Sequence, residues 1–316
     1  MSYDYSFIGS EIRRIRKNRN ISQKDLANMV GISEESLRRI ENNHNNPRMD
    51  NFLQILEVLG IDFEIILMDD CGSSWHLINE QIKAIDNDLE NLSLSNLHTN
   101  IERLESLKDF TSASYQTKLM QYILYYQGIY EKDINKDYLK FRDCLLKALE
   151  INGKSLNEDI NNTYCDIEKR ILIKLSEYYY YSNAKENSRA ILTYLLENVD
   201  VNDNNYIDIL YNLAKYNYMQ KSYNEAIETC QKAIDLSSKT NNYKRIILIY
   251  YLLGISKFKF NKKSYKEDIE KSLILCDLLK KPELKIIINQ SVSSILAEKV
   301  TPQNCGVTFI WIFYIM

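Results

Sequence analysis

Two groups of side chains in this 316-residue sequence are suited to recognising other molecules. Arg38 and Arg39 are adjacent, and a guanidinium group can bind the edge of a guanine through two parallel hydrogen bonds. Asn212 lies among tyrosines, and its amide both donates and accepts hydrogen bonds, so it can bind a peptide unit whatever side chain that unit carries. Both patterns indicate binding. The alternative in each case is an ordinary solvated position on a helix.

Patterns typical of catalysis are absent from the sequence. It contains no phosphate-binding loop, no cluster of metal ligands and no nucleophile motif. The six cysteines, at positions 71, 144, 165, 230, 276 and 305, are widely scattered, and there are only three histidines. Neither a zinc site nor a disulfide framework follows from this spacing, so we interpret the cysteines as free thiols. We expect no catalytic residue, no metal and no cofactor.

The two arginines belong to a stretch, residues 22 to 42, whose residue types fit two helices joined by a tight turn. Ala27 is small where the second helix must approach, and Gly31 can adopt a left-handed conformation without steric cost. Ser22 and Ser33 are suited to cap the starts of the two helices. The apolar residues that would pack the helices together are Leu26, Val30, Ile32, Leu37 and Ile40.

This stretch resembles the Cro and phage-repressor (Xre-type) helix-turn-helix family, and the resemblance extends over residues 8 to 60. In that family the second helix lies in the major groove of DNA and the start of the first contacts phosphate. The resemblance implies that Gln23 contacts a phosphate, and that the groove faces Ser33, Glu34, Glu35, Arg38 and Arg39. The alternative for the two glutamates is a favourable interaction with the helix dipole alone.

The charge balance restricts how DNA could be bound. With 40 basic and 43 acidic residues, the chain cannot have a broad polycationic surface, so any DNA contact must be local. Local clustering is present in the predicted helix from residue 8 to 19, which contains Arg13, Arg14, Arg16, Lys17 and Arg19. The expected partner is double-stranded DNA with a palindromic operator, because one helix-turn-helix domain reads half of a palindrome and two copies must be held together.

Composition indicates an almost all-helical chain, with three prolines and eight glycines and long apolar periodicity. The sequence shows neither a signal peptide nor a membrane-spanning segment, so we expect a cytoplasmic protein without a membrane partner. We predict an all-α fold with four parts. These are a helix-turn-helix domain (1–70), a linker helix with a first hairpin (71–110), a tetratricopeptide-like repeat domain (111–300) and an apolar tail (301–316).

Two segments after the helix-turn-helix are open to two interpretations. In residues 61–70 the apolar Ile61, Phe63, Ile65 and Leu67 alternate with Asp62, Glu64, Ile66 and Met68, which fits either a strand pairing with a second copy or a fifth helix. Between residues 75 and 92 the apolar residues follow the spacing of a coiled-coil seam, and these are Ile78, Ile82, Ile85, Leu89 and Leu92. That helix either forms a dimer seam or is a linker that packs on the next domain.

The rest of the chain reads as pairs of helices, and residues 207–238 resemble a tetratricopeptide repeat. Small residues recur on the first helix of each pair, 48, 38 and 40 residues apart, at Gly128, Ser176, Ala214 and Gly254. The spacing is irregular and longer than the 34 residues of that family. Stacked pairs of this kind form a right-handed superhelix with a concave face.

A short linear peptide is the expected ligand of this concave face. In tetratricopeptide repeats the first helix of each pair lines the groove, and on the helix from residue 207 several polar residues recur away from Leu210, Leu213 and Ala214. The predicted peptide-binding residues are Tyr125, Tyr211, Asn212, Lys215, Tyr218 and Tyr251. The alternative for the tyrosines is packing between repeats, and for Asn212 it is simple exposure to solvent.

The order of domains resembles the peptide-pheromone regulators of the Rgg, PlcR and NprR class (RRNPP). That resemblance implies a homodimeric quorum-sensing transcription regulator whose DNA binding responds to an imported peptide. Alternatives are a regulator without a small ligand, or a scaffold that grips a protein, such as a response regulator in the manner of Rap proteins. The apolar residues 307–316 fit a segment docked on the last repeat or a sequence altered by truncation or frameshift; alternatives are a membrane anchor or a partner site.

Overall fold

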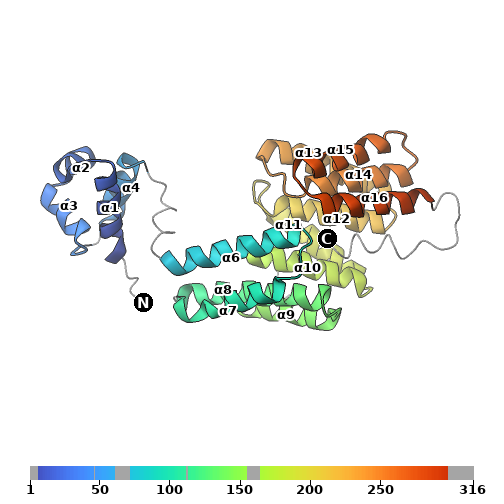
Figure 1. The fold of residues 1–316 in the computed structure, drawn as a ribbon, viewed down its shortest axis with the longest axis horizontal. Coiled ribbons are helices and arrows are strands. Elements are labelled where there is room, and N and C mark those ends of the chain that lie inside the picture. Colours follow the sequence, from blue (N-terminus) through green and yellow to red (C-terminus); the bar gives the residue numbers. More distant parts are fainter. Residues whose placement is uncertain (1–5, 46, 61–71, 112, 155–163, 298–316) are drawn as a thin grey trace. The chain divides into compact units, whose positions relative to one another are not determined.

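The computed structural model describes residues 6–45, 47–60, 72–111, 113–154 and 164–297, and the elements within these ranges are all helices (Figure 1). The predicted all-α fold class is therefore confirmed. Contacts divide the chain into an N-terminal unit, Met1–Gln81 with Asp109–Thr111, and a repeat unit, Ile82–Lys108 with Ser112–Met316. The predictions for residues 61–70 and 307–316 lie outside the described residues. No described helix is both long and apolar enough to cross a membrane.

The N-terminal unit contains the predicted helix-turn-helix. Its helices are α1 (Ser6–Asn18), α2 (Gln23–Val30), α3 (Glu34–Glu41) and α4 (Met49–Val58). The Ser22 hydroxyl accepts a hydrogen bond from the backbone N–H of Asp25 at 3.0 Å, and Ser33 accepts one from that of Ser36 at 3.1 Å. Gly31 has a φ of 73°, as the turn requires. The fully buried core residues are Ile12, Leu26, Leu37, Ile55 and Leu59.

Helix α6 (Gly72–Glu90) begins in the N-terminal unit and ends in the repeat unit, which also contains α7 (Leu97–Ser106). The short 3₁₀ helix η1 (Lys108–Phe110) follows α7 in the chain. Ile82 and Ile85 are buried within the single chain. The Tyr126 hydroxyl donates to Asp86 Oδ1 at 2.9 Å, which places α8 against the same part of α6. The dimer-seam interpretation is therefore wrong for these isoleucines. An apolar stripe that repeats every seven residues requires a partner surface, and here the same chain provides that surface.

The repeat unit consists of the predicted helix pairs (Figure 1). They are α8 (Ala113–Asp133) with α9 (Tyr138–Glu150), α10 (Asp166–Tyr181) with α11 (Lys185–Asn198), α12 (Tyr206–Met219) with α13 (Tyr223–Thr240), and α14 (Ile246–Lys259) with α15 (Tyr265–Leu278). Helix α16 (Pro282–Ala297) packs on the last pair. Each pair contacts its neighbours in sequence, as stacked repeats do.

Small residues permit the close approach of the two helices within a pair. A Cβ atom on Gly254 would lie 2.6 Å from Ile269 Cγ1 and 3.1 Å from the backbone oxygen of Tyr265, so atoms of α15 would have to shift away from α14. The equivalent positions of the other pairs are also buried, and they hold Gly128, Ser176 and Ala214. The recurring small residues of the sequence thus have a packing role, which explains why they recur despite the irregular period.

Candidate nucleic-acid interface and ligand groove

The outer face of α3 carries the two predicted reading arginines, and Glu35 binds both of them. Arg38 donates from Nε to Glu35 Oε2 at 2.7 Å and from Nη2 to Oε1 at 2.8 Å, while Arg39 Nε lies 3.2 Å from Oε1. All three side chains are at least half exposed. The hydrogen bond from Arg38 lowers the pKa of Glu35 to about 2. A base edge that binds the Arg38 fork must therefore displace an ionised carboxylate.

The other predicted DNA-contacting residues differ in how free they are to bind. Ser33 and Glu34 are exposed at the start of α3, and the Ser33 hydroxyl is engaged there as the cap and with Ser36 Oγ at 2.7 Å. Gln23 is half-buried, and its Nε2 donates to Glu41 Oε2 at 2.7 Å. The Gln23 amide is thus positioned by α3 before any phosphate arrives.

Arg16 does not belong to the basic surface of α1 that the sequence suggested. It is buried, donates from Nε to Glu41 Oε1 at 2.6 Å and from Nη2 to Oε2 at 2.8 Å, and donates from Nη1 to the Ile21 oxygen at 2.8 Å. Through these bonds Arg16 connects α1 both to α3 and to the turn that precedes α2. The exposed basic residues of this helix are Arg13, Arg14 and Lys17, with Arg19 just beyond its end.

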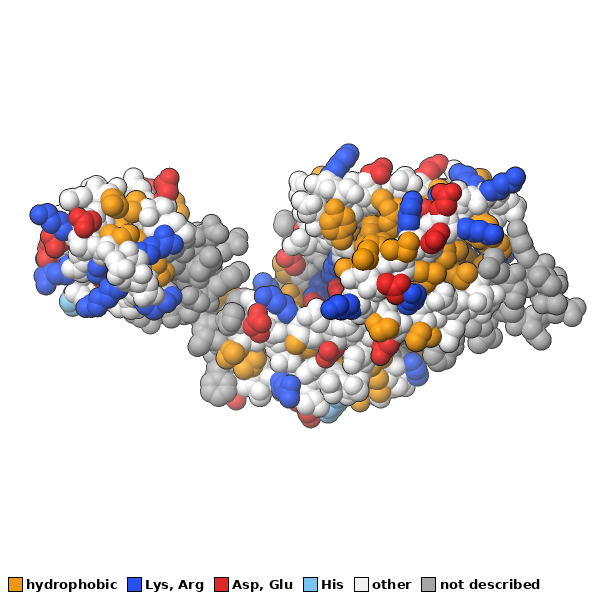
Figure 2. Space-filling model, turned by 45° about the horizontal axis from the view of Figure 1, so that its top comes forward, with side chains coloured by type: hydrophobic (Ala, Val, Ile, Leu, Met, Phe, Trp, Pro, Cys, Tyr) orange, Lys and Arg blue, Asp and Glu red, His pale blue; other side chains and the backbone are white. Residues whose placement is uncertain are grey.

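In the repeat unit, the first helices of two pairs, α10 and α12, each have a polar face that borders a cavity. On α10 these residues are Arg170, Lys174, Glu177 and Tyr181, and on α12 they are Asp208, Asn212, Lys215 and Met219, both sets at helical spacing. Parts of the two faces line two cavities, of about 100 Å³ and about 10 Å³. Figure 2 shows apolar side chains mixed with charged ones of both signs on one face of this unit.

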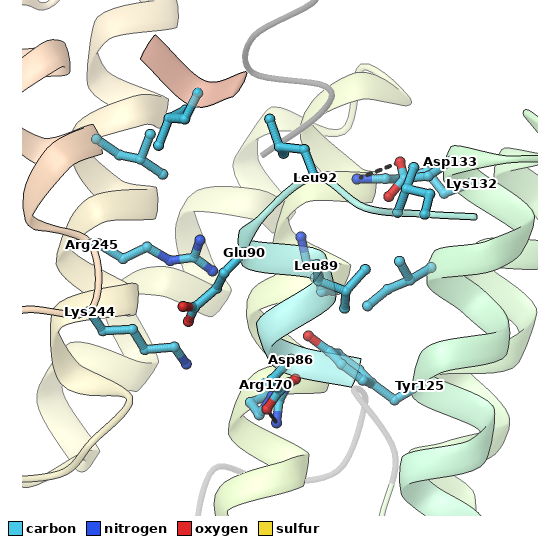
Figure 3. A pocket seen from close by; sticks show the side chains of 15 residues that line it. Asp86, Leu89, Glu90, Leu92, Tyr125, Lys132, Asp133, Arg170, Lys244 and Arg245 are labelled. Carbon is cyan, nitrogen blue, oxygen red and sulfur yellow. Dashed lines mark hydrogen bonds and ion pairs between the residues drawn. The ribbon is translucent and has the colours of Figure 1, made fainter. Parts of the chain in front are cut away.

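The larger cavity is lined by α6, α8, α10, α14 and α16 and by residues just before α14 (Figure 3). Asp86 accepts hydrogen bonds from Arg170 Nη1 at 3.0 Å and Nη2 at 2.5 Å. The Arg170 guanidinium also lies over the Tyr125 ring, 4.8 Å from its centre. Apolar walls complete the cavity, formed by Leu89, Leu92, Leu94, Ile129, Leu248 and Leu284. Such a mixture of apolar walls and fixed polar groups is typical of a ligand site.

Two further ion-pair clusters border these cavities. Lys132 lies 3.1 Å from Glu177 Oε1 and 3.4 Å from Asp133 Oδ1, and Lys174 lies 3.1 Å from Glu177 Oε2. Burial opposes ionisation of Glu177, but the two lysines hold its pKa well below the ordinary value. The second cluster joins Asp208 to Arg245 at 2.5 Å and to Lys244 at 3.0 Å. The charged groups are thus fixed in place by partners from other helices.

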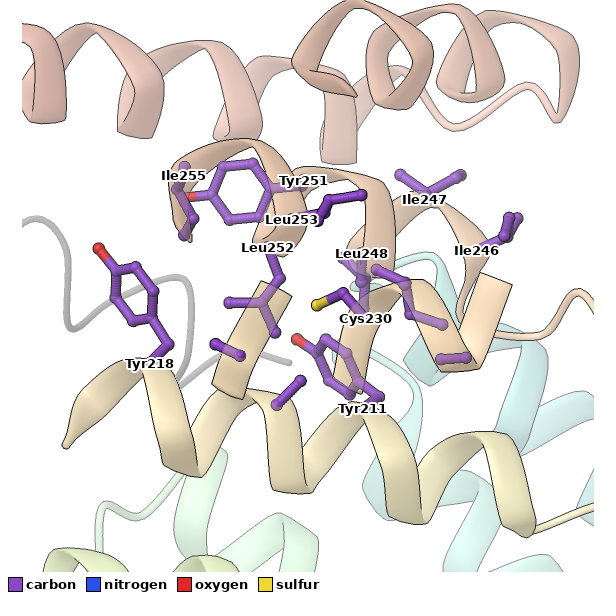
Figure 4. Packing of buried hydrophobic residues seen from close by; sticks show 14 of the residues in the cluster. Tyr211, Tyr218, Cys230, Ile246, Ile247, Leu248, Tyr251, Leu252, Leu253 and Ile255 are labelled. Carbon is purple, nitrogen blue, oxygen red and sulfur yellow. The ribbon is translucent and has the colours of Figure 1, made fainter. Parts of the chain in front are cut away.

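The structure separates the six predicted ligand-binding residues. Tyr125 lines the larger cavity, and Asn212 and Lys215 line the smaller one. Tyr211, Tyr218 and Tyr251 lie in the hydrophobic core, where packing between repeats, the alternative interpretation, describes them (Figure 4).

The expectation that Tyr211 and Tyr218 share the polar face of α12 is wrong. Tyr211 packs in the same cluster as Leu210 and Ala214, because α12 is covered by α10, α13 and α14 and so has more than one buried side. Several charged residues that line the larger cavity were not predicted from the sequence, namely Asp86, Lys132, Arg170, Lys174 and Arg245. For Arg170 and Lys174 a signal existed, since these charged residues lie four apart on either side of the apolar residues 171–173 and mark a helix face that needs partners.

Comparison with known proteins agrees with this architecture. Residues 12–66 match the family HTH_3, helix-turn-helix. The N-terminal unit is a helix-turn-helix domain. No match was found among curated protein sequences.

Solved structures resemble the chain over nearly its whole length. PlcR of Bacillus thuringiensis, in complex with the peptide PapR7 and DNA, is 20% identical with a TM-score of 0.74, covering 90% of this chain and 99% of PlcR. The Streptococcus dysgalactiae SHP pheromone receptor Rgg2 is 14% identical with a TM-score of 0.60, and the match covers 91% of this chain and 99% of Rgg2. ComR from S. thermophilus, in complex with DNA and its signalling peptide ComS, is 15% identical with a TM-score of 0.57, and the match covers 91% of this chain and 99% of ComR. The chain therefore has the fold of these proteins.

Proposed function

We propose that the protein is a transcriptional regulator that binds DNA through its helix-turn-helix domain and responds to a short linear peptide bound in the repeat unit, as in quorum sensing. One observation carries the proposal: a structure solved with both a peptide and DNA matches 90% of this chain with a TM-score of 0.74. In this proposal the protein acts in the cytoplasm, performs no catalysis and binds a palindromic operator as a homodimer, because each helix-turn-helix domain reads one half-site.

The helix-turn-helix domain supports the DNA-binding half of the proposal. Arg38 and Arg39 are exposed in the first two turns of the second helix of the motif, where side chains of this motif reach base edges. The exposed basic residues of α1 supply positive charge for phosphate contacts. The repeat unit supports the ligand half, because charged groups fixed by neighbouring helices lie beside apolar walls in the larger cavity.

The proposal is tested by selecting the preferred DNA from a random pool with the full chain, then measuring affinities for the selected and a scrambled duplex. Arg38→Ala should reduce discrimination between them by about 1–3 kcal/mol, the usual effect of losing one bidentate base contact. Arg48→Ala is a matched control, since Arg48 is exposed and precedes α4. A selection that yields no preferred sequence would refute the DNA-binding function, and equal losses on both duplexes would refute the base-reading role of Arg38.

A further inference from the structure

Lys215 on α12 is a buried lysine without a direct partner. Its side chain lines the smaller cavity and the residue is 5% exposed, but among the described residues no hydrogen bond to its ammonium and no carboxylate within 4 Å is found. A charge that is removed from water and not paired is costly. The buried ammonium of Lys215 therefore lowers the stability of the fold, and a ligand group of opposite charge would offset this free-energy cost.

The surroundings of Lys215 carry a surplus of positive charge. Among the described residues that line the smaller cavity, Glu177 of α10 is the only other charged one. Its two carboxylate oxygens are already engaged, one by Lys132 of α8 and the other by Lys174 of α10. Lys132, Lys174 and Lys215 thus face two carboxylates, Glu177 and the Asp133 that also pairs with Lys132. Arg245, which pairs with Asp208, adds a further positive contribution from its place before α14.

Neutral donors complete the cavity wall. The Ser188 hydroxyl lines the cavity on a residue only 2% exposed. Asn212 uses one amide hydrogen in a bond to the Asp208 oxygen at 2.8 Å, which leaves its second amide hydrogen for another acceptor. An ammonium, a hydroxyl and an amide on residues that line one cavity can donate to the acceptor oxygens of a carboxylate.

We infer that the smaller cavity is a carboxylate site in which Lys215 binds an acidic group of the ligand. The ligand class, a peptide, rests on the proposed function; the carboxylate is either its C-terminus or an Asp or Glu side chain. At about 10 Å³ the cavity has room for roughly one water-sized group, which is enough for one carboxylate oxygen. Met219, a flexible side chain on the cavity wall, can move to admit the rest of the group.

Binding should depend on pH in a way that identifies Lys215. Burial lowers the pKa of Lys215 to about 8, with Lys174 and Lys132 acting in the same direction and Glu177 opposing them. A carboxylate beside the ammonium favours its protonated form. Affinity for an acidic ligand is therefore full below pH 8 and declines above it, whereas a variant without this lysine does not show the decline.

The experiment uses the full chain, immobilised, and synthetic heptapeptide pools identified after capture by mass spectrometry. Four pools combine a free or an amidated C-terminus with the presence of Asp and Glu or their replacement by Asn and Gln. Wild type is compared with Lys215→Met, which removes a buried charge but keeps a similar volume and should fold, and with Lys221→Met, an exposed control just beyond α12. Melting temperatures confirm that both variants are folded.

Wild type and Lys221→Met should enrich peptides with a carboxylate at one fixed position, and the pools show whether that position is the C-terminus or a side chain. For such a peptide, Lys215→Met should reduce affinity roughly 10- to 100-fold, the range expected for a charge-assisted hydrogen bond. The neutral analogue of the peptide should bind both proteins alike. Enrichment of the same acidic peptides by Lys215→Met would overturn the carboxylate site while the peptide function survives. Capture of no peptide by wild type would overturn both.

Discussion

Glu41→Gln tests whether one buried ion pair holds the helix-turn-helix together. Glu41 lies at the end of α3, is 2% exposed, and accepts two hydrogen bonds from Arg16 and one from Gln23. Glutamine has nearly the same shape but no charge and only one acceptor oxygen in place of two. The substitution therefore leaves the buried Arg16 guanidinium with a neutral partner and one hydrogen bond fewer.

The expected cost follows from this geometry. Removing one partner of a buried ion pair costs about 3–5 kcal/mol, and the oxygen that glutamine retains recovers part of it, so we expect about 2–4 kcal/mol. Arg16 also keeps its bond to the Ile21 oxygen, which supports the lower part of the range. At about 1.4 kcal/mol for each factor of ten, amides of α1 to α4 should exchange roughly 30- to 1,000-fold faster.

Hydrogen exchange followed by mass spectrometry is the suitable assay, because it reports on these helices separately from the repeat unit in the full chain. Glu57→Gln is the matched control, since Glu57 is exposed on α4 and undergoes the same chemical change. Protection in the repeat unit should be unchanged by either variant. If Glu41→Gln accelerated exchange by less than about threefold, or no more than Glu57→Gln, the buried pair would not stabilise the domain as argued.

Three further predictions concern the recognition helix, the helix pairs and the buried lysine. Glu35→Gln should raise affinity for random DNA roughly 3- to 10-fold more than Glu34→Gln, because Glu35 and not Glu34 pairs with Arg38 and Arg39. Fluorescence-anisotropy titrations over a series of salt concentrations measure this difference, and equal effects of the two variants would contradict it. Gly254→Ala should destabilise the repeat unit by about 1–3 kcal/mol in denaturant unfolding, despite the better helix propensity of alanine, and unchanged stability would show that α15 can retreat. The pKa of Lys215 is about 8 in the folded protein and 10.5 ordinarily, so between these pH values the unfolded state binds more protons than the folded state. The free energy of unfolding of wild type should therefore rise relative to that of Lys215→Met from pH 8 to 10.5. Parallel curves of unfolding free energy against pH would refute this prediction.

The sequence alone determined the features that depend on neighbouring residues. The caps at Ser22 and Ser33 and the left-handed turn at Gly31 are set by local hydrogen bonding and sterics, and the structure has each of them. The helix pairs follow from apolar periodicity, and the small residues that include Gly254 mark where two helices approach. These features are encoded within one or two turns of helix, so a single sequence is enough to predict them.

Only the tertiary structure decided which surface each side chain meets. Periodicity shows that Ile82 and Ile85 need a cover, but not whether the cover is a second copy or, as found, the same chain. The pairing of Arg16 with Glu41 joins residues 25 apart, and that of Arg170 with Asp86 joins residues 84 apart, so no local spacing announces them.

The groove face of α12 shows the same limit. A helix covered from several sides has more than one buried stripe, so the tyrosine at 211 enters the core while Asn212 beside it lines a cavity. Propensity and periodicity describe one helix at a time. The position of a charge or an aromatic ring relative to a cavity depends on how the neighbouring helices stack, and that is settled by packing of the whole repeat unit.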